Sequence, residues 1–299
     1  MILCCGEALI DMLPRKTEAG ESAFAPHAGG AVFNTAIALG RLGAPAGYFG
    51  GLSTDLFGQI LEGSLRDSRV DHSLCPRSDR PTTLAFVTLT DGQARYAFYD
   101  ENTAGRLLSE SDLPGADAQI DALFFGGISL VGEPAADSYA ALCARAGDRP
   151  VMIDPNIRPG FIRDEAAYRA RLQTMLGRAD IVKISDEDLD WLGSDPAELI
   201  AGGTRVLLLT RGAEGVTVLT ADGNLDVPAR KVAVVDTVGA GDTFNAGFLA
   251  GLHRDGLLDR GALQGITAEA CAPAAELGTR AAAITVSRAG ANPPWDTEL

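Results

Sequence analysis

Residues 236–248 read DTVGAGDTFNAGF, a stretch in which glycines and an aspartate stand at the start of a run of small residues. An apolar run precedes the stretch, and the residues from Thr243 onward predict a helix. Gly239 and Gly241 flank Ala240 and allow backbone N–H groups to crowd toward one point, where the helix N-terminus adds partial positive charge. The stretch therefore predicts an anion hole for a phosphoryl group.

Asp242 falls in the first turn of this predicted helix, beside the anion hole. One interpretation is that the carboxylate is a helix cap and nothing more. A cap, however, does not require glycines on both sides of Ala240. In phosphoryl transfer the protein mainly positions groups and stabilises charge, and a carboxylate accepts the proton of the attacking hydroxyl. We therefore predict that Asp242 is the general base and that the backbone amides of 239–241 hold the developing charge.

Outside this stretch, short apolar runs alternate with helix-like segments along the whole chain. The alternation predicts an α/β fold, with a mostly parallel sheet and helices on both faces, in a single domain over residues 1–299. Ligands of such sheets bind beyond the carboxyl ends of the strands. The expected strands are 2–5, 46–49, 122–125, 151–153, 181–183, 206–209 and 216–219. The expected helices are 35–42, 135–146, 165–176 and 243–252.

Two segments, near 12–30 and 82–104, interrupt this alternation. The first is polar and contains Pro14 and Pro26, whereas the second alternates apolar and polar residues as antiparallel strands do. We expect these segments to form a small β-stranded lid that projects from the main domain. Two surface hairpins without a function are the alternative interpretation.

The composition is that of a globular protein, with 299 residues of which 46% are apolar and 22% charged. The formal net charge is −15, and no cluster of Lys and Arg is present to neutralise phosphates, which argues against nucleic-acid binding. A polyanionic ligand such as ATP would therefore need donors placed locally in its site.

The N-terminal apolar run is short and continues into Glu7 and Asp11, so it predicts a buried strand and not a signal peptide. No later segment is long enough to span a membrane. The cysteines are scattered without a C-x-x-C pair, which indicates a reducing compartment and neither a disulfide framework nor a zinc site. We therefore expect a cytoplasmic protein. The cysteines are Cys4, Cys5, Cys75, Cys143 and Cys271.

Two signatures carry a resemblance to a known family. Residues 236–248 closely resemble the C-terminal signature of the ribokinase-like, pfkB-type carbohydrate kinases, and residues 29–36, GGAVFNTA, with the RLG of 41–43 resemble their N-terminal signature. The resemblance extends over almost the whole chain. It implies an ATP-dependent carbohydrate kinase of ribokinase-like fold that uses Mg²⁺ and has Asp242 as its catalytic base.

The resemblance also implies which residues bind the sugar. Relatives use residues that match Gly30 and Asn34, next to Gly29, and an aspartate that matches Asp11 at the end of the first strand. Taken singly, a turn glycine, a helix cap and an exposed strand-end carboxylate are the ordinary explanations of these residues. Their occurrence together with 236–248 favours a sugar site.

Looser matches concern the nucleotide. Residues 210–215, TRGAEG, resemble the family's turn beside the ATP phosphates or ribose, and 282–287 with 290–291 resemble the closing strand and loop that flank the adenine. The residues that the resemblance assigns to ATP are Lys183, Ser185, Thr210, Gly212, Gly215 and Thr279.

Two metal sites are implied in the same way. The family's Asn-x-x-Glu motif helps to organise magnesium, and this chain has Ser185-x-x-Asp188 in its place. The shorter carboxylate of Asp188 can still hold Mg²⁺ through a water molecule. In many relatives the loop beside the adenine forms a monovalent-cation site, which implies K⁺ at Asp236 and Val238.

The motifs at 6–11, GEALID, and 154–158, DPNIR, are closest to those of fructokinases. Arg158 would then contact the transferring phosphate or the sugar, with a surface salt bridge as its alternative role. In the lid, Phe98 and Tyr99 would supply an apolar wall and one hydroxyl to the sugar, or else form the core of the lid itself.

Asp100 stands where fructokinases and 2-keto-3-deoxygluconate kinases place an arginine that would pair with a substrate carboxylate. An aspartate there would repel a sugar acid and also departs from a standard fructokinase pocket, so a neutral sugar or a riboside is expected. Among these, the motifs at 6–11 and 154–158 favour D-fructose, giving fructose 6-phosphate. The alternatives within the family are a 2-keto-3-deoxygluconate kinase, a ribokinase and a nucleoside kinase. A non-catalytic sugar sensor is the alternative outside it, whereas a dinucleotide-dependent oxidoreductase would need the G-x-G-x-x-G after the first strand that is missing here. A homodimer formed through the lid is a further expectation from the resemblance.

Overall fold

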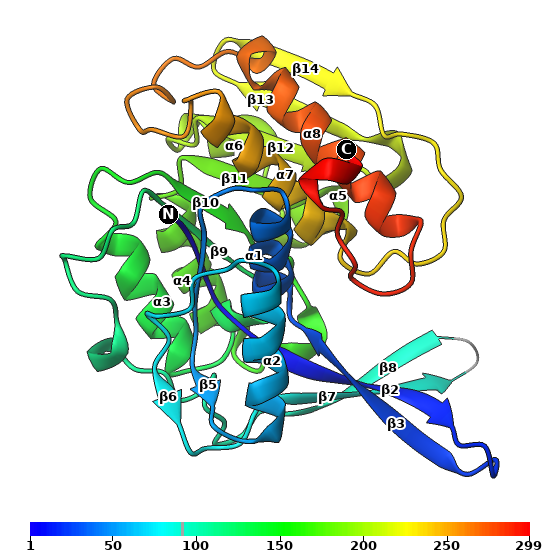
Figure 1. Ribbon diagram of the computed structural model, residues 1–299. Coiled ribbons are helices and arrows are strands. Elements are labelled where there is room, and N and C mark those ends of the chain that lie inside the picture. The colour runs from blue at the N-terminus through cyan, green and yellow to red at the C-terminus, as the bar shows by residue number, and fades with distance from the viewer. Residues whose placement is uncertain (91–92) are drawn as a thin grey trace.

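The computed structural model describes residues 1–90 and 93–299, and its centre is an eight-stranded sheet (Figure 1). In spatial order the strands are β14 (Gly223–Val227), β13 (Val216–Thr220), β12 (Val206–Thr210), β11 (Ile181–Ser185), β10 (Val151–Asp154), β9 (Ala122–Gly126), β1 (Ile2–Cys5) and β4 (Ala46–Phe49). The strands from β12 to β4 are parallel, and β13 and β14 extend one edge in antiparallel fashion. The mostly parallel sheet predicted from the alternation is confirmed.

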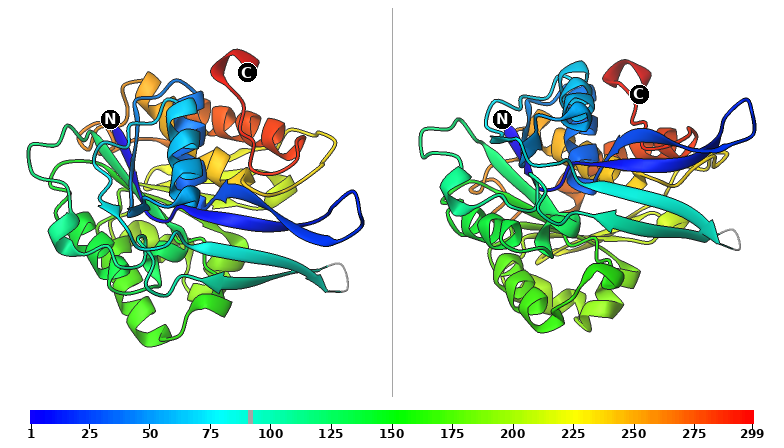
Figure 2. Two further views of the ribbon diagram at one scale, coloured as in Figure 1. Left: turned by 60° about the horizontal axis from the view of Figure 1, so that its bottom comes forward. Right: turned by 90° about the horizontal axis from the view of Figure 1, so that it is seen from below.

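Helices cover both faces of this sheet (Figures 1 and 2), as a parallel sheet with buried strands requires. One face carries α1 (Ala31–Arg41), α2 (Leu56–Asp67), α7 (Ala240–Arg254) and α8 (Ala268–Val286). The other carries α3 (Ala135–Ala144), α4 (Glu165–Leu176), α5 (Asp186–Leu192) and α6 (Pro196–Ala201). In the part of the chain that the structure describes, no helix has the length and apolarity needed to cross a membrane.

The two segments that interrupt the alternation form a second sheet, which extends from the side of the main domain (Figure 2). Its strands are β3 (Ser22–Gly29), β2 (Leu9–Lys16), β7 (Leu84–Thr90) and β8 (Gln93–Tyr99). We call this sheet the lid. Residues 91 and 92, within the second predicted segment, lie outside the described residues. A short parallel pair, β5 (Leu52–Ser53) and β6 (Arg77–Ser78), flanks α2.

The register of the lid strands separates two faces. Asp11 is paired with Ala85, and Ala85 with Phe98, so these side chains share one face of the lid. Phe86 and Tyr99 fall on the opposite face, where their ring centroids are 5.5 Å apart. The alternation of side chains along a strand thus determines which lid residues can reach the main domain's site.

The structure corrects one predicted element and adds others. Residues 282–287 were expected to form a closing strand, but 268–286 are one helix, α8, and the prediction was wrong. Locally the β-branched residues there favour a strand. A helix forms instead because small residues let α8 pack closely on α7. A Cβ added at Gly247 would lie only 2.6 Å from the Cα of Gly278. Helices α2, α5 and α6 and strand β14 were not predicted.

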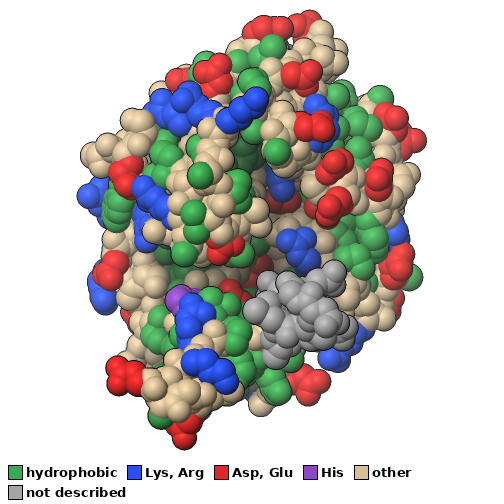
Figure 3. Space-filling model, turned by 90° about the vertical axis from the view of Figure 1, so that its right-hand side faces the viewer, with side chains coloured by type: hydrophobic (Ala, Val, Ile, Leu, Met, Phe, Trp, Pro, Cys, Tyr) green, Lys and Arg blue, Asp and Glu red, His purple; other side chains and the backbone are tan. Residues whose placement is uncertain are grey.

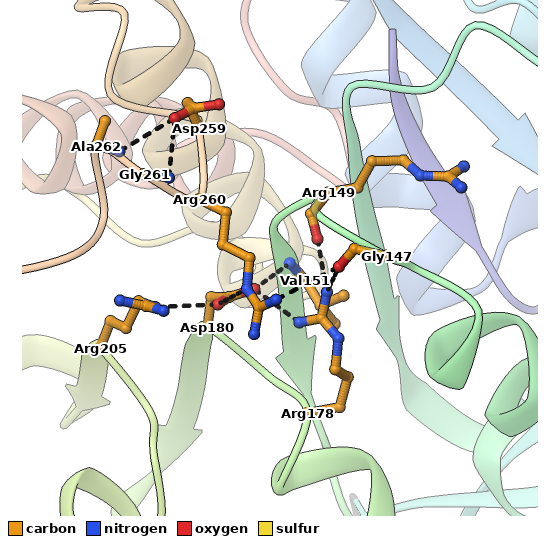
Figure 4. A network of polar contacts seen from close by, with 10 residues as sticks. All are labelled: Gly147, Arg149, Val151, Arg178, Asp180, Arg205, Asp259, Arg260, Gly261 and Ala262. Atoms are coloured by element: carbon orange, nitrogen blue, oxygen red, sulfur yellow. Dashed lines mark hydrogen bonds and ion pairs between the residues drawn. The ribbon is translucent and has the colours of Figure 1, made fainter.

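A charged cluster joins the strands at the end of the sheet opposite their carboxyl ends (Figure 4). The Asp180 carboxylate, 2% exposed, accepts hydrogen bonds from Arg178 (2.9 Å), Arg205 (3.1 Å), Arg260 (3.0 Å) and the Val151 amide (3.0 Å). Burial alone would raise the pKa of Asp180, but these bonds hold it below its ordinary value. One carboxylate therefore ties β10, β11, β12 and the loop between α7 and α8 together.

Replacing Asp180 with Asn should destabilise the protein by roughly 2–3 kcal/mol, because three guanidinium groups lose their shared anion. The pKa is depressed in the folded state, so this stability is present above about pH 4 and is lost as the pH falls further. Urea unfolding at pH 7 measures the loss. Unchanged stability at pH 7 would show that the cluster contributes nothing, and an Asp259→Asn variant, on the same loop but outside the Asp180 contacts, is the control.

Candidate active site

A cavity of about 390 Å³ lies beyond the carboxyl ends of β10 and β11, between the start of α7 and the lid. Figure 3 faces the lid side, where the surface is hollowed and shows both basic and acidic side chains. The cavity is lined by Glu7, Leu9, Asp11, Gly30, Ala31, Phe98, Ile128, Asp154, Asn156, Arg158, Phe161, Lys183 and residues 237–242. The first-strand, lid and 236–248 motifs, distant in sequence, thus meet around one space.

Asp242 lies at the inner end of this cavity, in the first turn of α7, and is 9% exposed. Its Oδ2 accepts a hydrogen bond of 2.9 Å from the side-chain amide of Asn34 on α1. Burial raises the pKa of Asp242 to about 7, although the Asn34 bond and the charge of Lys183 oppose the rise. A carboxylate with a pKa near neutrality is well matched to accepting a hydroxyl proton.

The predicted anion hole falls on the backbone turn before α7. Gly239 is the N-cap residue of α7 and has φ 77°, a left-handed conformation that favours glycine. A Cβ at this position would also lie 2.7 Å from the Cβ of Ala291. Residues 237–241 line the cavity beside Asp242, and within this turn the Ala240 amide donates to the Thr237 carbonyl oxygen at 3.3 Å.

Asp11 and Gly30 also line the cavity, and Gly29 packs against Asp11. Burial raises the pKa of Asp11 to about 6. A Cβ at Gly29 would lie 2.3 Å from Asp11 Oδ2, and Gly30 has φ 110° with its would-be Cβ 2.8 Å from the carbonyl oxygen of Glu7. The absence of a side chain at both glycines therefore lets the backbone lie close to Asp11 and Glu7. A turn by itself would not require this close approach.

Glu7 is a site residue that the sequence did not identify. Its carboxylate accepts hydrogen bonds from the amides of Ala31 (2.9 Å) and Ser129 (3.2 Å), and it lines the cavity. Burial raises its pKa above the ordinary value, while these hydrogen bonds lower it. The signal was available in the GEALID motif at 6–11, where the glutamate lies two residues after the end of β1.

Lys183 lies beneath the anion hole: a Cβ at Gly241 would be 3.4 Å from its Nζ. Its ammonium group forms a buried ion pair of 3.0 Å with Asp154 Oδ2, which also accepts a hydrogen bond of 2.7 Å from Asn245. The remaining oxygens, Asp154 Oδ1 and Asn245 Oδ1, are buried and have no hydrogen-bond partner among the described residues. Asp154 and Asn245 were not predicted as site residues, although both fall inside quoted motifs.

The lid reaches the cavity through Phe98, whose ring packs on Phe161 at a centroid distance of 4.4 Å. Phe161 was not predicted and comes from the loop after β10, where Arg158 also lines the cavity. Tyr99, predicted to contact the sugar, lies on the opposite lid face, is 62% exposed and does not line the cavity. Its place is set by the two-residue alternation of β8.

Asp100 does not line the main cavity. Its carboxylate pairs with the guanidinium of Arg106 at 2.7 Å, and Arg106 also donates to the carbonyl oxygen of Glu133. The charge of Asp100 is thereby balanced by a neighbour that the sequence did not reveal. On the side of the first strand and the lid, the carboxylates that line the cavity are those of Glu7 and Asp11 instead.

The residues assigned to ATP, apart from Lys183, do not line this cavity. Ser185 accepts a hydrogen bond from the amide of Asp188 (3.0 Å) and so caps α5. The Thr279 hydroxyl donates to the Glu276 carbonyl on α8. Thr210 ends β12 and Gly212 and Gly215 follow it, at the carboxyl edge of the sheet next to β11.

The two implied cation positions differ in their geometry. Asp188 is buried, accepts a hydrogen bond from the Ile157 amide (3.0 Å), and has a pKa raised by burial and by the charge of Asp154. The Asp236 carboxylate accepts hydrogen bonds from the backbone amides of Val238 (3.0 Å) and Gly290 (2.9 Å). Among the described residues no group of three or more His, Cys, Asp or Glu side chains is arranged to hold a metal ion by itself.

Comparison with known proteins agrees with this geometry. The profile of the pfkB family carbohydrate kinases matches residues 1–298. A fructokinase of Rhizobium leguminosarum bv. trifolii is 53% identical over 267 residues, covering 87% of this chain and 82% of the relative. A crystal structure of fructokinase with bound ATP from Xylella fastidiosa superposes with a TM-score of 0.89 at 31% identity, over 97% of this chain and 93% of the other. A Vibrio cholerae fructokinase, solved with fructose, ADP and potassium, gives a TM-score of 0.83 at 25% identity, with 97% and 93% covered.

The fold and the cavity define an enzyme that transfers a phosphoryl group to a hydroxyl. The chain belongs to the pfkB family of carbohydrate kinases.

Proposed function

We propose that this chain transfers the γ-phosphate of ATP to the O6 hydroxyl of D-fructose. The observation that carries the proposal is the position of Asp242, buried at the inner end of the cavity between the α7 anion hole and the amide of Asn34. The relatives named fructokinase support fructose as the acceptor.

The residues divide the chemistry between two ends of the cavity. At one end Asp11 and Gly30 bind hydroxyl groups of the sugar, so that the hydroxyl that reacts faces Asp242. Asp242 accepts the hydroxyl proton while the oxygen forms its bond to the γ-phosphorus, and the bond to ADP breaks. The amides after Gly239 stabilise the charge on the phosphoryl oxygens, and Lys183, beneath them, is placed to donate to the same group.

Asn34 holds the base in place. Because its amide donates to Asp242 Oδ2, the other carboxylate oxygen is left to receive the proton. The ring pair of Phe98 and Phe161 forms part of the cavity wall on the lid side. Closing the lid over the sugar would exclude water and so limit hydrolysis of ATP.

Two cations fit the side chains present. The orphan oxygen of Asp154, with the nearby Asp188, suits Mg²⁺, which in phosphoryl transfer binds one or two carboxylates and bridges substrate phosphates. Asp236 and the backbone at Val238 suit a monovalent cation, in keeping with the potassium of the Vibrio cholerae structure. When bound, these ions neutralise charge on the phosphates and on the loop that faces them.

A screen of ADP release against fructose, ribose, tagatose, 2-keto-3-deoxygluconate and nucleosides tests the substrate. We expect kcat/KM for fructose to exceed that of every other acceptor by about tenfold or more, since hydrogen bonds to hydroxyls discriminate strongly. The acidic pair Glu7 and Asp11 should make 2-keto-3-deoxygluconate the poorest sugar. A preference for that acid, or ATP turnover with no acceptor dependence, would contradict the proposal.

The pH dependence should follow the ionisation of Asp242. The base acts only when deprotonated, and its pKa is raised to about 7, so kcat/KM for fructose should rise with pH through a midpoint near 7. Asn34→Ala removes the bond that lowers this pKa, and should shift the midpoint upward. Rate measurements from pH 5 to 9 give both midpoints. A flat profile across this range would argue against Asp242 as the base.

We also propose that the lid mediates a homodimer. Its face opposite the cavity carries Phe24 (41% exposed), Phe86 and Tyr99 (62% exposed), with Phe24 and Phe86 ring centroids 5.0 Å apart. An apolar aromatic face of this kind is typical of subunit contacts. Light scattering of the intact chain measures its mass, and a monomer at micromolar concentration would contradict the proposal.

A further inference from the structure

The loop at 287–293, which follows α8, packs against the turn before α7 on which the proposed anion hole lies. The Gly290 amide donates to the Asp236 carboxylate at 2.9 Å. Ala291 packs so closely on Gly239 that a Cβ added to this glycine would lie 2.7 Å from the Ala291 Cβ. The conformation of the turn before α7 therefore depends on where loop 287–293 is held.

Arg41, the last residue of α1, holds this loop. Its Nη1 donates to Asn292 Oδ1 at 2.8 Å and to the Pro293 carbonyl at 2.9 Å. Its Nε donates to Ser68 at 3.2 Å, and its guanidinium lies 5.5 Å from the centroid of the Trp295 ring. The side chain is thus fixed on both sides, by Ser68 and by the aromatic ring, while two bonds extend to the loop.

The other end of α1 reaches the base. Ala31 at its first turn donates to Glu7, and Asn34 donates to Asp242. Most residues between Val32 and Gly40 are buried against the sheet and α7, so the helix behaves as a rigid element. One helix therefore positions the base from its first turn and the anion-hole loop from its last residue.

We propose that Arg41 is a positioning residue for the anion hole, acting through Asn292 and Pro293 on loop 287–293 and through that loop on Gly239. The inference rests on the proposed function, because it takes the amides after Gly239 to hold a nucleotide phosphate. Loss of the Arg41 bonds frees the loop, and the nucleotide then has to order it on binding, which weakens its affinity. Among the described residues, none of 287–293 lines the cavity, so the affinity for the sugar should not change.

Arg69 provides a matched control. Its guanidinium lies on the same Trp295 ring, at 4.9 Å from the centroid. Within the described part of the chain, the Arg69 side chain makes no hydrogen bond to residues 287–293. Arg69→Met therefore removes an arginine from the same aromatic ring without removing a bond to the loop, whereas Arg41→Met removes both bonds and retains the apolar stem.

Isothermal titration of ADP with Mg²⁺ into the full chain tests the proposal, with fructose KM from steady-state kinetics as the second measurement. We expect Arg41→Met to weaken ADP binding by about tenfold, as the loss of two hydrogen bonds predicts, and to change the fructose KM by less than about twofold. Arg41→Lys should recover part of the ADP affinity, since an ammonium can keep one of the bonds. Asn292→Ala, which removes one bond from the loop side, should weaken ADP binding by about threefold.

The outcomes separate a positioning role from a merely structural one. Unchanged ADP affinity in Arg41→Met, with or without a lower melting temperature, would overturn the inference while leaving the proposed function intact. Equal losses for ADP and fructose would overturn it too, because they would show a general loosening of the fold. Arg69→Met should bind ADP as the wild type does, and a loss as large as that of Arg41→Met would be a third contrary result. Failure of the wild-type chain to bind ADP would overturn the proposed function and the inference together.

Discussion

Replacing Asp242 with Asn should lower kcat with fructose by about 10³-fold while the ADP dissociation constant changes by less than about twofold. The amide has nearly the same shape as the carboxylate and can still accept the Asn34 hydrogen bond, but it cannot take up the hydroxyl proton. The anion hole and Lys183 are untouched, so nucleotide binding persists. Coupled ADP-release kinetics and titration calorimetry measure the two quantities.

The same substitution should not weaken the fold. A carboxyl whose pKa is raised to about 7 in the folded state destabilises the protein at pH values above the unfolded pKa near 4, and the neutral amide removes that penalty. The melting temperature of Asp242→Asn should therefore equal or exceed that of the wild type at pH 8. Asp255→Asn, at the exposed C-terminal end of the same helix, is the control for kcat. Turnover of Asp242→Asn within about tenfold of wild type would refute the assignment of the base.

The second large effect is expected from Gly239→Ala, which should lower kcat/KM for ATP by about 10²-fold. The new Cβ would have to occupy space 2.7 Å from the Cβ of Ala291, on a residue whose φ of 77° already disfavours a side chain. Either the turn or loop 287–293 must move, and the backbone amides at the start of α7 are then displaced.

Two other glycines separate the possible causes. Gly256 has φ 69° and no atom within 4 Å of a would-be Cβ, so Gly256→Ala isolates the backbone strain and should leave kcat/KM unchanged. Gly241→Ala adds a Cβ whose nearest contact is Lys183 Nζ at 3.4 Å, and its effect should be smaller than that of Gly239→Ala. If Gly239→Ala kept wild-type activity, or Gly256→Ala lost as much, the close approach to Ala291 would not be the cause.

Much of the main sheet could be predicted because its strands are short apolar runs buried on both faces, which is a local signal. The start of a helix within 236–248 could be predicted for the same reason, and the roles proposed there rest on glycines and an aspartate that are neighbours in sequence. The lid was predicted because apolar and polar residues alternate in its second segment, unlike the continuous apolar runs of the main sheet. Each of these features depends on residues that are close together along the chain.

The remaining site residues depend on contacts between distant segments. Glu7 is held by the amides of Ala31 and Ser129, the latter 122 residues away, and the GEALID motif around it does not show these contacts. Arg106 balances Asp100 in a loop whose path the sequence does not reveal. Residues 282–287 were predicted as a strand from their resemblance to the family's closing strand, whereas in the structure they belong to α8, which packs on α7.

The two-sided register of the lid has a consequence for how this protein tolerates change. Along β2 the odd-numbered position Asp11 belongs to the cavity, and in β8 adjacent residues Phe98 and Tyr99 point to opposite sides. Substitutions at neighbouring positions should therefore affect unrelated properties, in a pattern that repeats every second residue. Insertion of a single residue would exchange the two sets, which makes lid length far more constrained than lid composition.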